Sequence, residues 1–576
     1  MIPGQAMGNS SRVSATIGNR RPVDDLTDKP RTSPRGTVIL VVLLTIVGAG
    51  FRFGGLDTRD FWFDESCTFI YVHNLFDWPE DSSLLVESTN LPYYAVLRGW
   101  VTLFGDSEAG YRSFSAALAT LAIPLLAIVA WRLGTSLAAA VCAGLVAFNP
   151  LHIHYAHEAR AYAMWVFLLS IVLWLLVEAS RQTRRRWWVG YGLAMLLCLH
   201  LHYFTIYLVP ATASCILLAT NRRRALRRWF VTNIVVGILF IPYFLTAVLP
   251  AGRGGGSAWI SGSWEPLLAI PRTLWAFLPA GGYPAHLRGL SMLSSDTIRM
   301  GPNWIAAAAR IIPAMIVVLA LLLVIRRRVL GADQAEKPTH NTSHLAALAG
   351  FVLVPLLLAW AYSLIVRPNY LVGRYDLVAW PALMVSLALI VGEFARTVAR
   401  RRSGRAALVT CVVLGACSLV PITRMAALKP PPTLHKLRAM RLAEIAHPGD
   451  LVVTFSYDRD YLLYYLHRAG FAGRIVSYPS WLDGQIGWLD TAADLETDTD
   501  VSLSDAAGRV GEIDSTLRAG NRVWFLLDSH ELRGRSVRSE INDVLLDALA
   551  GAGFYSDLFD GDLWIFSVLR SDSTMM

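Results

Sequence analysis

The sequence predicts a polytopic α-helical membrane protein of about eleven transmembrane helices, followed by a C-terminal extracytoplasmic α/β domain. Hydrophobic residues make up 54% of the 576 positions and charged residues only 16%, which leaves too little polar surface for a soluble protein of this length. Several apolar windows exceed the ~18 residues that cross a bilayer. Arginines cluster between these windows, so the net charge of +9 indicates cytoplasmic loops and not nucleic-acid binding.

The N-terminal 1–36 segment is polar and rich in Arg, Ser and Pro, which predicts a disordered tail. Its arginines predict that the tail stays in the cytoplasm. The apolar span 37–53 lacks a small-residue cleavage site, so we interpret it as an uncleaved anchor that carries the chain to the outer face. An outer loop follows at 54–108. Its second half, NLPYYAVLRGWVTLFG, is apolar but short and predicts a helix that lies in the membrane interface.

Further crossings complete a transmembrane domain at 37–425. We expect them at 110–131, 135–149, 161–180, 187–201, 203–220, 229–250, 303–325, 345–366, 375–395 and 405–422. Arginine runs then fall on the inner side, at 181–186, 222–228, 326–328 and 396–405. This count predicts a multi-pass protein of the plasma membrane whose C-terminus lies on the outer side.

The segment KPPPTLHK marks a change to soluble composition, and 430–576 predicts an α/β domain. The runs DLVVTF, RIVSY, RVWFLLD and LWIFSVL are short and rich in β-branched or aromatic residues, which is typical of strands. DYLLYYLHRAG and SEINDVLLDALAGAG are predicted helices that end near glycine. No GxGxxG fingerprint opens this domain, so no cofactor is assigned to it.

Four unusual segments are predicted on the outer side of the membrane. They are FWFDES (61–66), NPLHIHYAHEARAY (149–162), LHLHYF (199–204) and RPNYLVGRYD (367–376). Ionisable groups close to a bilayer are costly and usually functional. We therefore expect these segments to converge on one site.

Asp64 and Glu65 are neighbours, so on a helix they diverge by ~100° and cannot both face one point. One acid is expected to act on a substrate while the other orients the loop; the alternative is a solvated pair or a helix cap. Glu158 and Arg160, with Tyr162 close behind, are further candidates. For Glu158 the competing interpretation is a local ion pair at a helix start.

Arg374 and Tyr375 follow a glycine at an outer boundary, where the positive-inside rule does not explain a cation. A guanidinium suits bidentate phosphate binding. His154 and His157 are three residues apart, which on a helix would place both rings on one face, where they could hold a divalent metal. Interfacial hydrogen bonding is the alternative for these histidines and for His202.

In this order, the segments resemble the GT-C membrane glycosyltransferases, particularly the protein O-mannosyltransferase and aminoarabinose transferase group. The resemblance lies in FWFDES, NLPYYAVLRGWVTLFGDSEAGYRSFSAAL, NPLHIHYAHEARAYAMW and LVGRYDLVAWP, and covers about 37–395. The family pattern often has Gln where His157 stands.

The resemblance implies transfer of a sugar from a polyprenyl-phosphate donor to a hydroxyl of an envelope glycan, glycolipid or protein at the outer face. Asp64 is then the general base of an inverting reaction, Glu65 is the second catalytic residue of the acidic pair, and Glu158 is an acceptor-binding or second acid. The candidate donor-phosphate ligands are Arg160, Arg374, Tyr162, Tyr375 and His202. A divalent metal ion held by Asp64, His157 and Glu158 stays open as an alternative.

Two other functions compete with this one. A transporter or flippase of lipid-linked sugars predicts charges buried within the spans and often repeated halves, whereas we find no repeat and Arg310 as the main mid-span charge. A non-catalytic scaffold that binds cell-wall polymer would leave the outer acids unexplained.

The predicted topology places residue 430 onward outside the cytoplasm. A fusion of alkaline phosphatase at residue 425 should therefore be active in cells. An active cytoplasmic reporter at the same junction would overturn both this topology and the outward site.

Overall fold

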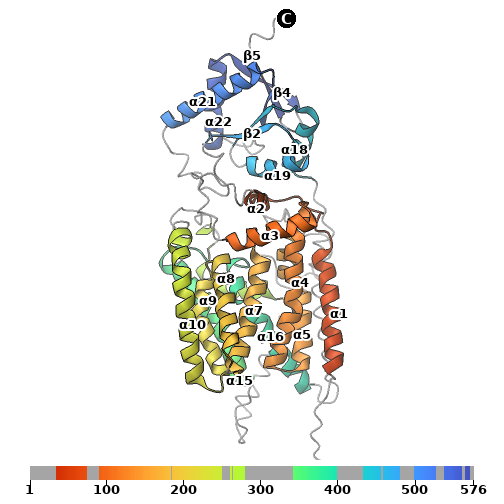
Figure 1. Cartoon of the computed structure of the whole chain (residues 1–576), viewed down its shortest axis with the longest axis vertical. Coiled ribbons are helices and arrows are strands. Elements are labelled where there is room, and N and C mark those ends of the chain that lie inside the picture. Colours follow the sequence, from red (N-terminus) through yellow and green to blue (C-terminus); the bar gives the residue numbers. More distant parts are fainter. Residues whose placement is uncertain are drawn as a thin grey trace, which may run out of the picture. The chain divides into compact units, whose positions relative to one another are not determined.

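The computed structural model describes residues 34–73, 90–182, 184–249, 260–261, 264–278, 341–398, 432–455, 458–480, 499–526, 537–560, 563 and 565–570. The expected tail and the expected spans 303–325 and 405–422, with Arg310, lie wholly or mostly outside this part of the chain. Most of the described residues up to 398 form a bundle of helices whose long axes run roughly side by side (Figure 1). The bundle helices are α1 (Pro34–Phe53), α4 (Glu108–Leu133), α5 (Ser136–Ala147), α7 (Tyr162–Arg181), α8 (Arg185–Leu201), α9 (Thr205–Ala211), α10 (Arg222–Tyr243), α15 (Asn341–Ile365) and α16 (Trp380–Val398).

Within the described residues, six helices are long and apolar enough to cross a membrane, or up to seven if the bent pair α5 and α6 (Pro150–Ala156) counts as one span. Large apolar side chains on the outside of α1 and α10, such as Ile46 and Ile238, are exposed in the isolated chain. Such side chains suit a lipid surface and would be costly in water. The chain is thus a multi-pass membrane protein. The prediction of a helical protein with several membrane-spanning helices is confirmed, whereas the number eleven stays a prediction.

Two predicted crossings are shorter than a span. The predicted span 187–201 coincides with α8, of 17 residues. The span 203–220 becomes α9 and a 3-10 segment, η3 (Thr212–Leu218). Pro210 lies inside α9 and removes a backbone donor, which explains why the regular helix ends there.

The predicted span 135–149 corresponds to α5, and the chain bends by 57° between α5 and α6. Asn149 starts α6, because its side chain accepts a hydrogen bond from the N–H of His152 at 3.0 Å. The fully buried Arg52 of α1 donates to the last carbonyls of α5, at 2.8 Å for Val146 and 3.0 Å for Ala147. The bend therefore has its free carbonyls satisfied by a side chain from another helix.

Two helices of the expected outer loop lie across one end of the bundle, α2 (Phe63–His73) and α3 (Leu91–Phe104) (Figure 1). The transverse α3 is the helix predicted from NLPYYAVLRGWVTLFG. Residues Phe63 to Val72 of α2 are all buried. A loop helix with no exposed face must be covered from both sides.

The C-terminal part contains a five-stranded sheet in the order β2-β1-β3-β5-β4. β1 is parallel to β2 and β3, whereas β5 is antiparallel to β3 and β4. The strands are β1 (Leu451–Phe455), β2 (Arg474–Tyr478), β3 (Val523–Leu526), β4 (Phe554–Asp560) and β5 (Ile565–Arg570). The accompanying helices are α18 (Leu434–Ile445), α19 (Asp458–Arg468), α21 (Thr499–Arg518) and α22 (Val537–Gly551).

Side chains alternate between the two faces of this sheet. Val453 and Phe525 belong to one hydrophobic cluster together with residues of α21 and α22. Val452 and Trp524 belong to the cluster that contains residues of α18, α19 and the bundle. The structure has strands at all four predicted positions. It adds β4, whose sequence FYSDLFD is mostly exposed at the sheet edge and lacks the apolar run of a buried strand.

Candidate active site

The acids of FWFDES lie in the first turn of α2. Free N–H groups and the helix dipole favour negative charge at a helix N-terminus. The two carboxylates point toward different partners, as expected for neighbours on a helix: Glu65 pairs with Arg112 and Asp64 with Arg374. The acids therefore belong to two separate ion pairs.

Glu65 forms a buried, bidentate ion pair with Arg112 of α4. Its carboxylate accepts from Arg112 Nε at 2.8 Å and from Arg112 Nη2 at 2.6 Å. It also accepts from the backbone N–H of Ala159 at 2.8 Å. Glu65 thus joins α2, α4 and the segment between α6 and α7, which makes it a structural brace.

The rest of the Arg112 guanidinium holds the start of the loop. Nη1 donates to the carbonyls of Leu56 at 2.8 Å and Arg59 at 2.6 Å, and Nη2 donates to that of Asp60 at 3.0 Å. All five N–H groups of this side chain are consequently used. One cation fixes the backbone on the N-terminal side of Asp64.

Asp64 lies between two arginines from segments distant in sequence. Its Oδ2 is 2.7 Å from Nη2 of Arg374 and 3.6 Å from Nη2 of Arg160. Arg160 also donates to the backbone carbonyl of Asp64 at 3.1 Å. All three residues are at most 7% exposed. Two cations therefore lie beside the Asp64 carboxylate.

Tyr162 completes the surroundings of Arg374. Its hydroxyl accepts from Arg374 Nε at 2.5 Å, and the guanidinium lies 5.3 Å from the centre of its ring. Burial would lower the pKa of Arg374, but Tyr162 and Asp64 raise it well above its usual value. Arg374 is thus a permanent cation with a defined orientation.

A tight turn presents Arg374 to this cluster. Gly373 has a φ of +76°, which favours glycine, and its N–H donates to Asp376 Oδ2 at 2.9 Å. Tyr155 of α6 donates to the carbonyl of Gly373 at 2.6 Å. Thr273 of α12 (Pro266–Phe277) donates to the same Asp376 oxygen. The turn is therefore held by α6 and α12 as well as by its own carboxylate.

The alternative interpretation for Glu158 was a local ion pair at a helix start. In the structure Glu158 does form a local pair, and its partner is His154. Oε1 of Glu158 lies 3.0 Å from Nε2 of His154. Burial alone would raise the pKa of Glu158, but His154 and Arg374 bring it below its usual value. Glu158 is therefore a carboxylate close enough to Arg374 to affect the charge of the cluster.

His154 and His157 do not lie on one helix, so the metal interpretation of their spacing loses its basis and the hydrogen-bonding alternative fits. α6 ends at Ala156, and His157 follows as its C-terminal cap. Its Nε2 lies 2.9 Å from the carbonyl oxygen of Phe51, and burial lowers the pKa of His157 to about 4. The neutral ring thus donates to the end of α1.

The predicted metal set Asp64, His157 and Glu158 has no shared centre, since each has the separate partner given above. In the part of the chain that the structure describes, no group of three or more His, Cys, Asp or Glu side chains could hold a metal ion.

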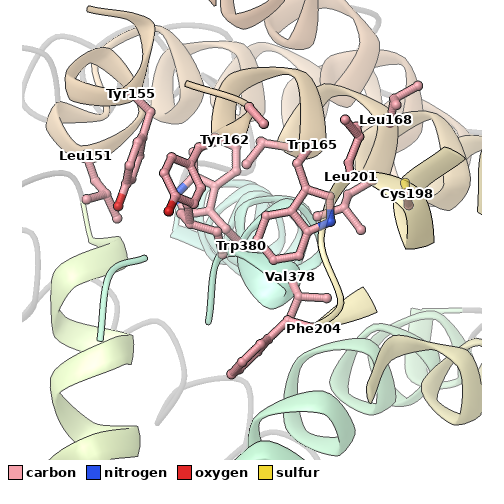
Figure 2. Close-up of a cluster of buried hydrophobic side chains, with 14 of the residues drawn as sticks. Leu151, Tyr155, Tyr162, Trp165, Leu168, Cys198, Leu201, Phe204, Val378 and Trp380 are labelled. Carbon is pink, nitrogen blue, oxygen red and sulfur yellow. The ribbon is translucent and has the colours of Figure 1, made fainter. Parts of the chain in front are cut away.

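His202 and Tyr375 lie in an aromatic layer beside Arg374. The ring of His202 stacks on Trp165 at 4.3 Å and lies 5.0 Å from that of Tyr375. Burial, Arg374 and Arg160 lower the pKa of His202 to about 3. Figure 2 shows Trp165 packed among apolar side chains of neighbouring segments, which makes this layer a rigid support.

Residues 91–246 match the sequence model of the dolichyl-phosphate-mannose-protein mannosyltransferase family. The predicted resemblance is confirmed. The match covers α3 to α10 and so includes Arg112, Arg160 and Tyr162. It agrees with the predicted enzyme class, a membrane glycosyltransferase. No curated protein matches the chain.

The fold is similar to that of a solved structure. The structure of ArnT from Cupriavidus metallidurans bound to undecaprenyl phosphate aligns with a TM-score of 0.51 at 15% identity, covering 93% of this chain and 98% of ArnT. The oligosaccharyltransferase of Archaeoglobus fulgidus, in complex with zinc and sulfate, has a TM-score of 0.47 at 11% identity and covers 84% and 67% of the two chains. The alignment with ArnT extends over both the helical bundle and the C-terminal part.

The four predicted segments do converge, but two important side chains were missed. Arg112 lies just inside a predicted span on the outer side, so the argument that identified Arg374 would also have found it. Asp376 was quoted within RPNYLVGRYD without a role. Its contact with Thr273 joins residues 103 positions apart, which no local pattern indicates.

If Glu65 is a brace, Glu65→Gln should destabilise the protein more than it alters chemistry. The change leaves Arg112 buried without a counter-charge, which costs about 3–5 kcal/mol. We expect a fall of several degrees in the unfolding temperature in detergent. Glu444→Gln is the matched control, because its pair with Arg441 is largely exposed. Equal unfolding temperatures for the two variants would contradict the brace.

Proposed function

We propose that the chain transfers a sugar from a polyprenyl-phosphate donor to an acceptor hydroxyl at the outer face of the membrane, with inversion and with Asp64 as general base. The observation that carries the proposal is the buried Asp64 carboxylate between Arg374 and Arg160. The family matched by residues 91–246 is named for mannosyl transfer from dolichyl phosphate, and the structure of ArnT was obtained with undecaprenyl phosphate. Membrane glycosyl transfer is the function class common to both.

The two guanidiniums beside Asp64 suit the phosphate of such a donor. A guanidinium can bind two phosphate oxygens at once, and Arg374 offers Nη2 once Asp64 releases it. Arg160 lies close enough to contribute a second cation. Tyr162 holds Arg374 in place through Nε, so phosphate binding requires little reorientation of the side chain.

The proposed reaction uses the Asp64 carboxylate and the guanidiniums of Arg374 and Arg160. The acceptor oxygen attacks the anomeric carbon on the face opposite the phosphate, and its proton passes to the Asp64 carboxylate. The bond between the anomeric carbon and the phosphate oxygen breaks, and the lipid phosphate leaves as an anion stabilised by the arginines. A bond forms to the acceptor, a bond to the phosphate breaks, and no acid is required for the leaving group.

The acceptor proposed here is a hydroxyl of an envelope glycan, glycolipid or protein. Glu158 is a second carboxylate near Arg374, which suits hydrogen bonding to an acceptor or to the sugar. Nothing in the described residues favours a transporter over this function. The buried Arg52 and Arg112 are instead hydrogen-bonded to carbonyls and, for Arg112, to Glu65.

The Arg374 assignment predicts a loss of donor use on substitution. Arg374→Ala should raise the KM for a lipid-phosphate sugar at least tenfold, because a charged hydrogen bond contributes about 1.5–3 kcal/mol. Arg374→Lys should recover only part of this loss, since lysine lacks the planar fork. Arg367→Ala serves as the control, since Arg367 lies in the same segment and is only half-buried. An unchanged KM in Arg374→Ala would remove this side chain from the donor site.

The Asp64 assignment predicts a loss of turnover. Asp64→Asn keeps the size of the side chain but cannot accept the proton of the acceptor, so turnover should fall about 10²–10⁴-fold. Donor binding should persist, because both arginines remain. The measurement is sugar transfer from a purified lipid-linked donor, with folding checked by thermal unfolding.

Asp57→Asn is the control, because Asp57 is an exposed acid of the same loop. A folded Asp64→Asn protein with parental turnover would exclude Asp64 as the base. Loss of donor binding together with turnover would instead favour a structural or metal-binding role.

A further inference from the structure

The C-terminal part of the chain covers the helix that carries Asp64. α2 lies between the end of the bundle and α19 (Figure 1). The ring of Phe61 lies 4.3 Å from that of Tyr464, and the ring of Phe63 lies 5.4 Å from that of Tyr461. One side of α2 and its preceding residues thus packs on aromatic side chains from more than 390 residues further along the chain.

Hydrogen bonds from the same C-terminal part reach the residues just before Asp64. The N–H of Phe61 donates to the hydroxyl of Tyr465 at 2.6 Å. The Asp60 carboxylate accepts from the N–H of Thr433 at 2.6 Å and from Lys436 Nζ at 2.9 Å. Lys436 also reaches Glu108 at the start of α4, at 3.2 Å. These contacts connect the loop, the bundle and the C-terminal part at one place.

The position of Asp64 is consequently set from two directions. On the bundle side, Arg112 binds the loop carbonyls and Arg160 binds the carbonyl of Asp64. On the other side, Tyr465 and Lys436 bind residues three and four positions before Asp64. A displacement of about 1 Å at a reacting group can cost 10²-fold in rate. A contact that fixes this backbone therefore acts on the rate through Asp64.

We propose that α18 and α19 of the C-terminal part belong to the catalytic unit, in which Tyr465 and Lys436 are positioning residues for Asp64. This inference rests on the proposed function, since it assumes that Asp64 acts on the acceptor. It assigns the C-terminal part a role in the reaction, as distinct from a role in binding a separate polymer.

Tyr465→Phe tests the proposal, because it removes only the hydroxyl that holds Phe61. Tyr464→Phe is the matched control: it removes a hydroxyl from the adjacent position of α19, which donates to the Asp106 carbonyl at 3.3 Å, and keeps the ring against Phe61. We expect Tyr465→Phe to lower kcat about tenfold, since a loosened backbone misplaces Asp64. The KM for the lipid-linked donor should stay within about twofold, because Arg374 and Arg160 are untouched.

A second readout does not depend on activity. Cys67 of α2 is 1% exposed and contacts Asp460 of α19, so its reaction with a maleimide reports the loosening of this contact. Peptide mass spectrometry should show faster labelling of Cys67 in Tyr465→Phe and in Lys436→Met than in Tyr464→Phe. Equal labelling in all variants and the parental protein would overturn the positioning role, as would a parental kcat for Tyr465→Phe.

The two hypotheses fail in different ways. If the parental protein transfers no sugar from a lipid-linked donor while Cys67 labelling responds as expected, the proposed function is wrong and the contact of α19 with α2 is real. If the parental protein is active and Tyr464→Phe loses as much kcat as Tyr465→Phe, the positioning role of the Tyr465 hydroxyl is wrong. A rise in KM alone in Tyr465→Phe would likewise contradict positioning of Asp64.

Discussion

The candidate site depends on the hydrogen bonds and the ion pair made by the Arg112 guanidinium. It binds both oxygens of Glu65 and the carbonyls of Leu56, Arg59 and Asp60, so one side chain of α4 organises the loop before α2. A buried ion pair pays a large desolvation cost and is favourable only when its hydrogen bonds are complete. Here they are complete, which explains how a loop without regular structure can hold Asp64 in one position.

Much of the fold was predictable because its signals are local. Apolar windows indicated α1, α4, α7, α15 and α16, and β-branched runs indicated four strands of the sheet. What could not be predicted depends on contacts between distant segments. The bend after α5 is an example: Pro150 indicates a break, but its carbonyls are satisfied by Arg52, which lies 94 and 95 residues earlier. The edge strand β4 has no apolar run to reveal it.

The sequence indicated which segments form the site, but it indicated less well which side chains contact one another there. Costly charges near a membrane boundary drew attention to Asp64, Arg160 and Arg374, and the structure brings these three side chains together. The histidine spacing failed as a signal because it assumed a continuous helix, whereas α6 ends before His157. Spacing predicts a shared face only within one helix, and helix ends are the least predictable positions of an element.

The pair formed by Asp64 and Arg374 has a consequence for ligand affinity. The carboxylate occupies Nη2 of the guanidinium, so it is an internal competitor of any anion that needs the same donor. An arriving phosphate competes with it, and the apparent dissociation constant is the intrinsic one divided by the fraction of molecules in which the internal pair is open. The exchange also works in the opposite direction: an anion bound to Arg374 favours the molecules in which the carboxylate is free of this counter-ion. The Asp64 carboxylate and a bound phosphate thus compete for the same guanidinium, and each is free for its own interactions when the other is bound.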